Sequence, residues 1–265
     1  MTVAAVLLAA GAGVRLGRGA PKAFLPLAGR PMFALSLEAM ARSGVVDCVV
    51  LVVPGELSER AGELVAGLPL TAPVEAVVSG GDTRQRSVAL GLEALPAGTD
   101  RVLCHDAARP FASPELFRRV VRALDRAEGA VPVVPSPDTV KRVRDGVVVE
   151  TVPRSEVGLA QTPQGFAVWA LRQAHRQAGS GGQTEATDDA ALVERCGLRV
   201  VAVEGEPGNF KITTAEDYRR AELVLAGEDP GSRAAPGGRR SPGAAEDRRA
   251  QAVVDRGAGA GGEPG

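Results

Sequence analysis

Short, mostly apolar runs alternate with stretches of helical periodicity over about the first 226 residues of the chain. The clearest runs lie at 3–10, 48–53, 74–78, 101–104 and 130–134. Runs of this length without polar alternation suit strands that are buried on both faces of a sheet. Strands that alternate with helices favour a parallel-rich α/β fold. We therefore expect one α/β domain over residues 1–226, with a mostly parallel sheet flanked by helices.

The first run leads into a glycine-rich loop that carries two cations. Gly11 and Gly13 allow a sharp turn, and they leave room for backbone N–H groups to surround an anion. Arg15 and Lys22 add positive charge, which suits a phosphate whose charge grows during a reaction. The loop is predicted to bind a nucleotide triphosphate. A glycine-rich surface turn with incidental basic residues is the alternative.

Two familiar phosphate-binding patterns do not fit this loop. A dinucleotide fingerprint needs a third glycine where the chain has Leu16, and a P-loop needs Ser or Thr after its lysine, where the chain has Ala23. Neither pattern is met, and further residues are needed to decide whether the loop binds a nucleotide.

Two later strands also end in loops with polar residues. Gly81 and Asp82 stand at the start of a predicted helix, where a base or phosphate could approach; Asp82 or Thr83 could instead cap that helix. Asp106 and Arg109 follow the run 101–104, and ligands of open α/β sheets bind beyond the carboxyl ends of strands. Asp106 could hold Mg²⁺ on a phosphate or accept from a substrate hydroxyl, whereas a salt bridge between Asp106 and Arg109 is the alternative.

The regular alternation is interrupted after residue 135. Segments 139–143 and 147–151 are rich in β-branched residues and flank Asp145-Gly146, a strong hairpin signal. We expect an arm over about 136–160 that projects from the domain. A two-stranded hairpin is only marginally stable alone, so a second subunit is its expected packing partner, and a flexible surface flap is the alternative.

The remaining signals concern helix starts and the end of the chain. Thr187 or Asp188 is predicted to cap a helix, and Thr213-x-x-Glu216 matches a capping box, which makes Thr213 structural; Lys211 has no such explanation. His105, beside an apolar strand end, is predicted to be a hydrogen-bonded structural residue. Residues 227–265 are poor in large apolar side chains and are expected to form a disordered tail.

Composition excludes several classes of protein. A net charge of −1 gives no reason to expect nucleic-acid or membrane-surface binding. The three cysteines lack the spacing of a disulfide framework or a zinc site. The N-terminus has no basic segment before its apolar run, and that run is too short to span a bilayer. We expect a soluble cytoplasmic protein.

Taken together, residues 4–226 resemble the 2-C-methyl-D-erythritol 4-phosphate cytidylyltransferases of the non-mevalonate isoprenoid pathway. The motifs that carry the resemblance are, in chain order, Leu8-Ala-Ala-Gly-x-Gly-x-Arg15, Pro21-Lys22, Gly80-Gly-Asp-x-Arg84-x-x-Ser87-Val88, His105-Asp-Ala-Ala-Arg-Pro110, Asp138-Thr-Val-Lys141, Thr151-x-x-Arg154, Gln161-Thr-Pro-Gln164, Thr187-Asp188 and Asn209-x-Lys211-Ile-Thr213. Each motif is weak alone, but their order and spacing are specific.

The resemblance implies a Rossmann-like nucleotidyltransferase fold and a homodimer in which each hairpin arm embraces the other subunit. It implies that CTP, with Mg²⁺ bridging its phosphates, binds at Ala9, Ala10, Gly11, Gly13, Arg15, Lys22, Gly81, Asp82 and Ser87. The acceptor sugar phosphate would be held by Asp106, Arg109, Thr162, Thr187 and Lys211, with Arg154 supplied by the neighbouring arm. Arg15 and Lys22 would be the catalytic residues that stabilise the transition state.

Two other functions remain open at this point. Ribitol 5-phosphate cytidylyltransferases share the glycine-rich loop and much of the segment 105–110, so the acceptor could be a different polyol phosphate. A CTP-binding regulator without turnover is the second alternative, although Arg15 and Lys22 argue for an enzyme. Some relatives continue into a cyclodiphosphate synthase domain; we expect a monofunctional enzyme, because the tail is short and has no Asp-x-His metal motif.

Overall fold

The computed structural model describes residues 1–11, 21–180 and 186–227. Gly13, Arg15 and the tail from residue 228 onward lie outside the described residues. The sequence-based predictions for them therefore stay predictions.

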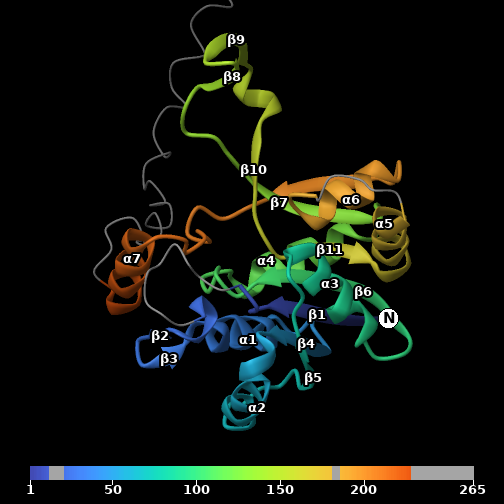
Figure 1. The fold of residues 1–265 in the computed structure, drawn as a ribbon, viewed down its shortest axis with the longest axis vertical. Helices are drawn as coiled ribbons and strands as arrows, with labels where there is room; N and C mark the ends of the chain where they lie inside the picture. Colours follow the sequence, from blue (N-terminus) through green and yellow to red (C-terminus); the bar gives the residue numbers. More distant parts are fainter. Residues whose placement is uncertain (12–20, 181–185, 228–265) are drawn as a thin grey trace, which may run out of the picture. The chain divides into compact units, whose positions relative to one another are not determined.

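A mixed sheet forms the centre of the described chain (Figure 1), in the order β10-β7-β11-β6-β1-β4-β5, with β12 also paired to β7. Its strands are β1 (Thr2–Leu8), β4 (Cys48–Val53), β5 (Val74–Ser79), β6 (Thr99–Asp106), β7 (Gly129–Pro135), β10 (Gly158–Ala160), β11 (Gln164–Ala167) and β12 (Val200–Glu204). The pairs β1·β4, β1·β6, β4·β5 and β7·β12 are parallel. The parallel core is as predicted.

The antiparallel strands of this sheet were not predicted. β10 pairs with β7, and β11 lies between β6 and β7, all in antiparallel register. Both strands are too short for a periodic pattern to reveal them. β11 places Gln164 opposite Cys104 of β6, and Thr162 just before it lies beside Asp106, whose N–H donates to its hydroxyl at 3.1 Å.

Helices cover both faces of the sheet. They are α1 (Met32–Ser43), α2 (Ser58–Ala66), α3 (Arg84–Glu93), α4 (Pro114–Ala123), α5 (Val168–Ser180) and α6 (Asp189–Arg195). The last helix, α7 (Ala215–Ala226), packs instead in a separate apolar cluster with Leu25, Leu27 and Ile212. Short 3₁₀ turns η2 (Lys22–Phe24), η3 (Gly55–Leu57) and η4 (Arg154–Glu156), and the small strands β2 (Pro26–Leu27) and β3 (Arg30–Pro31), complete the described elements.

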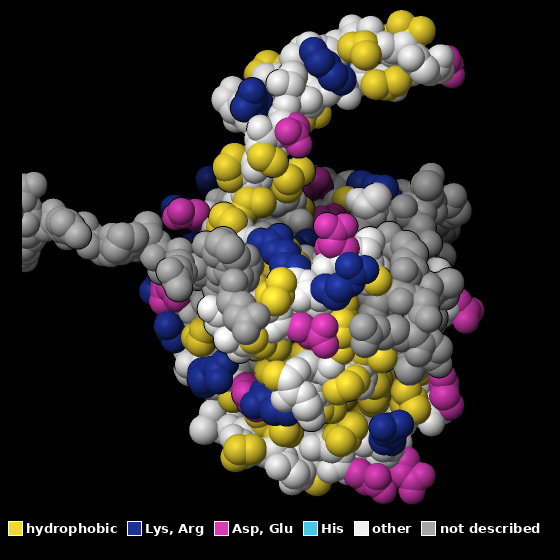
Figure 2. Space-filling view, turned by 90° about the vertical axis from the view of Figure 1, so that its left-hand side faces the viewer, with side chains coloured by type: hydrophobic (Ala, Val, Ile, Leu, Met, Phe, Trp, Pro, Cys, Tyr) yellow, Lys and Arg dark blue, Asp and Glu magenta, His cyan; other side chains and the backbone are white. Residues whose placement is uncertain are grey.

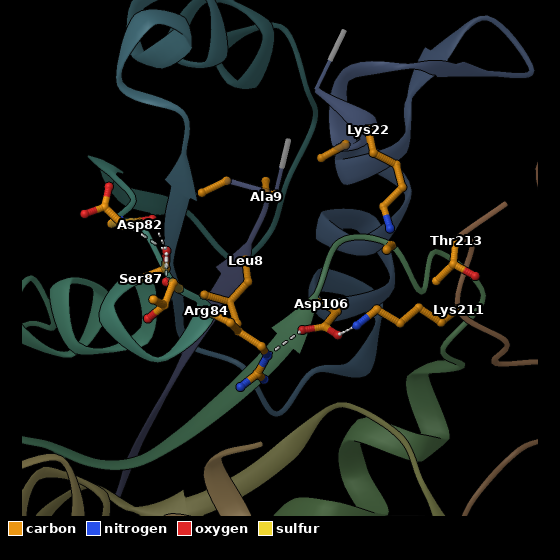
Figure 3. Close-up of a pocket in the computed structure, with 15 residues that line it drawn as sticks. Leu8, Ala9, Lys22, Asp82, Arg84, Ser87, Asp106, Lys211 and Thr213 are labelled. Atoms are coloured by element: carbon orange, nitrogen blue, oxygen red, sulfur yellow. Dashed lines mark hydrogen bonds and ion pairs between the residues drawn. The ribbon is translucent and has the colours of Figure 1, made fainter. Parts of the chain in front are cut away.

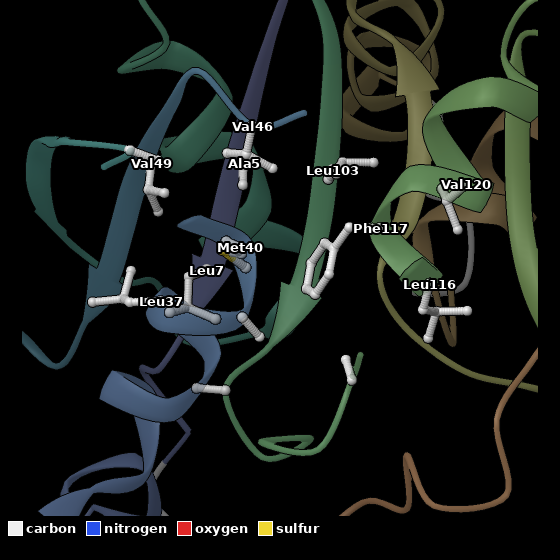
Figure 4. Packing of buried hydrophobic residues seen from close by; sticks show 14 of the residues in the cluster. Ala5, Leu7, Leu37, Met40, Val46, Val49, Leu103, Leu116, Phe117 and Val120 are labelled. Carbon is white, nitrogen blue, oxygen red and sulfur yellow. The ribbon is translucent and has the colours of Figure 1, made fainter. Parts of the chain in front are cut away.

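Strand β1 packs against apolar clusters on both of its faces, which explains why its apolar residues are consecutive. Val3, Ala5 and Leu7 pack into the cluster under α1 and α4, whereas Ala4 and Val6 pack into the cluster under α3 and α5. Figure 4 shows the first cluster, with side chains of α1 and α4 against β1, β4 and β6. Because both faces are covered, no position from Val3 to Leu7 can be polar without burying an unpaired group.

The predicted hairpin is present as a separate two-stranded sheet of β8 (Val140–Arg144) and β9 (Val147–Val152). Asp145 and Gly146 have φ of 48° and 79°, the positive values that a type I′ turn needs. Figures 1 and 2 show the hairpin standing clear of the sheet. Val147, Val148 and Val149 are 63%, 58% and 50% exposed, and together they form an apolar surface in contact with water.

The helix caps decide three predictions about where α3, α6 and α7 begin. Thr83 caps α3, since its hydroxyl accepts from Arg86 N, and Asp82 is left exposed. Asp188 caps α6. The capping box of α7 was predicted one residue too early: its N-cap is Thr214, not Thr213, and its partner is Asp217, not Glu216. Aspartate can replace glutamate here because its carboxylate reaches the N–H of Thr214 at 2.8 Å.

Two exclusions made from the sequence can be compared with the described chain. Cys48, Cys104 and Cys196 are free thiols, and the first two are buried. Over residues 1–11, 21–180 and 186–227, no helix has both the length and the apolar content that crossing a membrane requires.

Candidate active site

A cavity of about 590 Å³ lies at the carboxyl ends of β1 and β6 (Figure 3). It is lined by Leu8, Ala9, Ala10, Gly11, Lys22, Ala23, Gly81, Asp82, Thr83, Arg84, Ser87, Asp106, Ala108, Lys211 and Thr213. Every described residue that the family resemblance assigns to the nucleotide is in this set. The parallel strands explain the meeting, because their carboxyl ends open onto one edge of the sheet.

The loop between β5 and α3 is built so that its backbone forms a wall of this cavity. Gly81 N donates to Ser87 Oγ at 3.1 Å, and that hydroxyl donates to the carbonyl of Thr83 at 2.9 Å. A Cβ on Gly80 would lie only 2.4 Å from Cβ of Ala10, so this position requires glycine. Ser87 is nearly buried, and its hydroxyl holds the shape of the loop.

A second cavity of about 260 Å³ lies beside the first. It is lined by Arg84, Asp106, Arg109, Ala160, Gln161, Thr162, Gln164, Thr187, Asp188 and Lys211. All the residues predicted for the acceptor are in this set except Arg154, which lines neither cavity. Arg154 is exposed at the base of the hairpin, where its guanidinium lies 3.4 Å from Pro137 O and 3.5 Å from Thr139 Oγ1.

Asp106 lines both cavities and pairs with two cations. Its Oδ1 lies 3.2 Å from Nε of Arg84, and its Oδ2 accepts from Nζ of Lys211 at 2.7 Å. Burial alone would raise the pKa of Asp106, but these two cations hold that pKa well below its usual range. Asp106 is therefore ionised and acts only as an acceptor. The alternative salt bridge to Arg109 is not formed, since Arg109 donates to the carbonyls of Asn209 and Ala160.

His105 holds the backbone of this loop, as a structural histidine should. Its Nε2 lies 3.1 Å from the carbonyl of Arg109, and since a carbonyl only accepts, Nε2 carries the proton. Nδ1 is then free to accept from the hydroxyl of Thr162 at 3.0 Å. The same oxygen of Thr162 accepts from Asp106 N at 3.1 Å. The hydroxyl of Thr162 therefore supports Asp106 from behind.

This buried histidine makes stability depend on pH. Burial lowers the pKa of His105 to about 4, against about 6.5 in the unfolded chain. As the pH falls, the unfolded chain therefore takes up a proton before the folded chain does. The contribution of neutral His105 to the free energy of unfolding is full above pH 6.5 and is lost as the pH falls toward 4. Between pH 7.5 and pH 5 we expect the free energy of unfolding to fall by about 2 kcal/mol more than in His105→Gln. Urea unfolding at both pH values, in metal-free buffer, measures this; equal losses in the two proteins would show that His105 does not titrate in this way.

Lys22 is held close to another lysine of the cavity, Lys211. Its Nζ donates to the carbonyl of Ile212 at 2.7 Å. Ile212 is fixed in turn, because its N–H donates to Ala108 O at 2.8 Å and its side chain is buried with Leu25 and Tyr218. A contact between residues 190 positions apart in the chain thus brings Lys22 to the segment of Lys211, in the cavity that Asp106 also lines.

Arg84 and Thr213 are two of the cavity residues that the sequence had not assigned to a substrate. Arg84 belongs to a quoted motif, but only the structure shows that it pairs with Asp106 and lies beside both cavities. Thr213 lines the larger cavity, whereas the sequence explained it as a helix cap. Thr213 already had a sufficient explanation as a helix cap, and Arg84 was quoted only as part of a motif. No signal in the sequence therefore indicated their places in the cavities.

The fit of Mg²⁺ can be judged from the carboxylates. Mg²⁺ binds to one or two carboxylates together with phosphate oxygens and water. Asp106 is the carboxylate that faces both cavities, and each of its oxygens already pairs with a cation. Within the part of the chain that the structure describes, no three His, Cys, Asp or Glu side chains cluster to hold a metal. These residues fit an ion that arrives on a triphosphate.

Comparisons with known proteins agree with this geometry. A family model described as 2-C-methyl-D-erythritol 4-phosphate cytidylyltransferase matches residues 3–227. The bifunctional enzyme IspD/IspF of Nitrobacter hamburgensis is 44% identical over 225 residues, which are 84% of this chain and 55% of that protein. The chain thus spans about half the length of the curated relatives it matches.

Solved structures also match most of the chain. The 4-diphosphocytidyl-2C-methyl-D-erythritol synthase of Anaerococcus prevotii has a TM-score of 0.76 and 30% identity, covering 85% of this chain and 98% of that one. The 2-C-methyl-D-erythritol 4-phosphate cytidylyltransferase of Thermus thermophilus has a TM-score of 0.68 and 39% identity, covering 85% and 100%. By the match of the family model to most of its length, the chain belongs to the 2-C-methyl-D-erythritol 4-phosphate cytidylyltransferase family.

Proposed function

We propose that the chain transfers CMP from CTP to 2-C-methyl-D-erythritol 4-phosphate, giving 4-diphosphocytidyl-2-C-methyl-D-erythritol and pyrophosphate. One observation carries the proposal: two cavities meet at the ion pairs of Asp106 with Arg84 and Lys211. The larger cavity has the residues expected for a nucleotide, and the smaller one has the residues expected for a sugar phosphate. Two substrates bound there would meet beside Asp106.

In the larger cavity, CTP would lie over the end of β1. Ala9, Ala10 and Gly11 line the cavity, and backbone N–H groups bind phosphate oxygens well. The N–H of Ala9 already donates to Val52 O at 2.7 Å, so Ala10 and Gly11 would supply the donors. Gly81, Asp82 and Ser87 would form the wall for the base. Gly13 and Arg15, in the segment that follows Gly11, would complete the phosphate site.

In the smaller cavity, the acceptor would be held by charge and hydrogen bonds. Lys211 and Arg109 would bind its phosphate, and the ionised Asp106 would accept from a hydroxyl. Thr187 would add a hydroxyl contact. Thr162 would act mainly by holding Asp106, since its own oxygen is already used.

The reaction needs positioning more than acid–base chemistry. A phosphate oxygen of the acceptor, already anionic, attacks the α-phosphorus of CTP while the bond to pyrophosphate breaks on the opposite side. No proton has to be removed from the nucleophile. Lys22 and Arg15 would stabilise the negative charge that grows on the α-phosphate. Asp106 would help to hold Mg²⁺ that arrives on the phosphates of CTP, and the ion would supply neutralising charge for the leaving pyrophosphate.

We further propose a homodimer built through the hairpin arm. Arg154 lines neither described cavity, yet the family resemblance assigns it to the acceptor. The exposed valines of β9 would be covered by the partner, and Arg154 would enter the partner's site. A buried arm also removes the apolar surface of the free hairpin from water.

The proposed function is tested by pyrophosphate release. With CTP and Mg²⁺, 2-C-methyl-D-erythritol 4-phosphate is expected to give turnover, and EDTA is expected to lower the rate by about 10²-fold or more, reversibly on adding Mg²⁺. Ribitol 5-phosphate and ATP are the controls for acceptor and nucleotide. A clear preference for ribitol 5-phosphate would replace the acceptor, and CTP binding without any pyrophosphate release would leave a regulator.

A further inference from the structure

Arg84 stands between two carboxylates. It is the first residue of α3, and its Nε lies 3.2 Å from Asp106 while its Nη1 lies 2.8 Å from Oδ2 of Asp189. Figure 3 shows the guanidinium reaching along β6 toward Asp106. The arginine therefore connects the residue at the meeting point of the two cavities to a carboxylate in the protein interior.

Asp189 is buried and does not cap its own helix. It is 1% exposed at the start of α6, and the cap of that helix is the neighbouring Asp188. Its other polar neighbours are His175, whose Nε2 lies 3.7 Å away, and the buried thiol of Cys104. A carboxylate placed so deeply needs a cation, and breaking such a pair is far more costly than breaking an exposed one. Asp189 thus fixes where the guanidinium of Arg84 lies.

The guanidinium of Arg84 is directed at carboxylates, although the residue lines both cavities. Nε and Nη1 face Asp106 and Asp189, and Nη2, which has no hydrogen-bond partner among the described residues, is buried. A lysine could not do the same, because one ammonium group cannot replace the planar fork that spans two carboxylates. Of these contacts, the one with Asp106 lies where the two cavities meet.

We propose that Arg84, anchored by Asp189, is a positioning residue that orients the carboxylate of Asp106 toward the acceptor. Held by Arg84 on Oδ1, Asp106 keeps Oδ2 directed to Lys211 and to the acceptor cavity. The role rests on the proposed cytidylyl transfer. It predicts that Arg84 matters for the acceptor and that its effect vanishes when Asp106 can no longer carry charge.

The test compares the pair substitution Arg84→Met with Asp189→Asn, which removes both charges together and leaves no buried charge unpaired. Arg84→Lys is the conservative variant. The matched control is Arg101→Met with Asp125→Asn, which removes a largely buried arginine and its carboxylate, paired at 2.7 Å, near the other end of β6. Wild-type turnover is measured first, so a failure of the proposed function appears there and not in the variants.

In the Arg84 pair variant we expect KM for the acceptor to rise by about tenfold or more, with KM for CTP changed by less than about threefold. Arg84→Lys should lie between this variant and the wild type, and the Arg101 pair variant should match the wild type. In an Asp106→Asn background, the Arg84 pair substitution should change acceptor KM by less than about twofold.

Three results would overturn the role. An unchanged acceptor KM in the folded Arg84 pair variant would show that Asp106 needs no such support. An equal rise in both KM values, or a loss that multiplies with that of Asp106→Asn, would assign Arg84 to the general stability of the site instead. If the pair variant does not fold, Arg84→Lys alone decides, since an acceptor KM at the wild-type value contradicts the need for the fork.

Discussion

Replacing Lys22 by alanine is expected to lower turnover with saturating substrates by about 10²- to 10³-fold, with the fold and the subunit assembly intact. Lys22 lines the nucleotide cavity and reaches Ile212 O at 2.7 Å, so its ammonium already lies near Lys211. The attacking oxygen is anionic without help, and what remains for the enzyme is to stabilise charge on the α-phosphate. Removing a cation from that position removes the stabilisation where it is largest.

Pyrophosphate release at saturating CTP and acceptor measures the loss. The fold should survive because Lys22 is not fully buried, and the carbonyl of Ile212 that it leaves can bond to water. Lys22→Arg serves as the control that keeps the charge, and it should retain more activity than the alanine variant. A folded Lys22→Ala protein with less than a tenfold loss would remove Lys22 from its proposed role.

The second large effect concerns Arg154 and tests the proposed dimer. Arg154→Ala and Lys22→Ala should each be nearly inactive alone, but co-assembled subunits should regain about a quarter of the wild-type activity. In a mixed dimer with exchanged arms, one site carries both defects, and the other has an intact Lys22 and an intact Arg154. With half of the dimers mixed, one quarter of all sites is complete.

The two proteins are refolded together or co-expressed with different tags, and the purified mixture is assayed for pyrophosphate release. Arg144→Ala, which removes an exposed arginine elsewhere on the hairpin, is the control for loss of charge from the arm. An activity of the mixture no higher than the mean of its two components would mean that Arg154 acts within its own chain or that subunits do not exchange arms.

Much of the fold could be predicted from local patterns. The apolar run of β1 predicted a strand covered on both faces, and Asp145-Gly146 predicted the hairpin turn, because both depend on residues that are adjacent in the chain. Short strands such as β11 could not be predicted in this way. Their hydrogen bonds go to β6 and β7, which lie far away in the sequence.

The candidate site, like the fold, could be predicted only in part from the sequence. The described residues that the motifs proposed for a nucleotide line one cavity, and those proposed for the acceptor, apart from Arg154, line the other. Glycines, cations and a carboxylate at strand ends could be selected because their chemistry lies in their own identity. The pairing of Asp106 was not readable. Arg109 lies three residues away and was the natural partner in the sequence, whereas the folded chain brings Arg84 and Lys211 to it.

The sequence by itself therefore determined the kind of fold, the hairpin and the residue types of the proposed two-substrate site, since periodicity, turn chemistry and charge are local properties. Tertiary structure alone decided which groups act together: that Asp106 is ionised between two cations, that Asp189 anchors Arg84, and that Lys22 meets the segment of Lys211. The physical reason is that ion pairs and burial depend on distances between segments, and the sheet sets these distances by joining strands far apart in the chain.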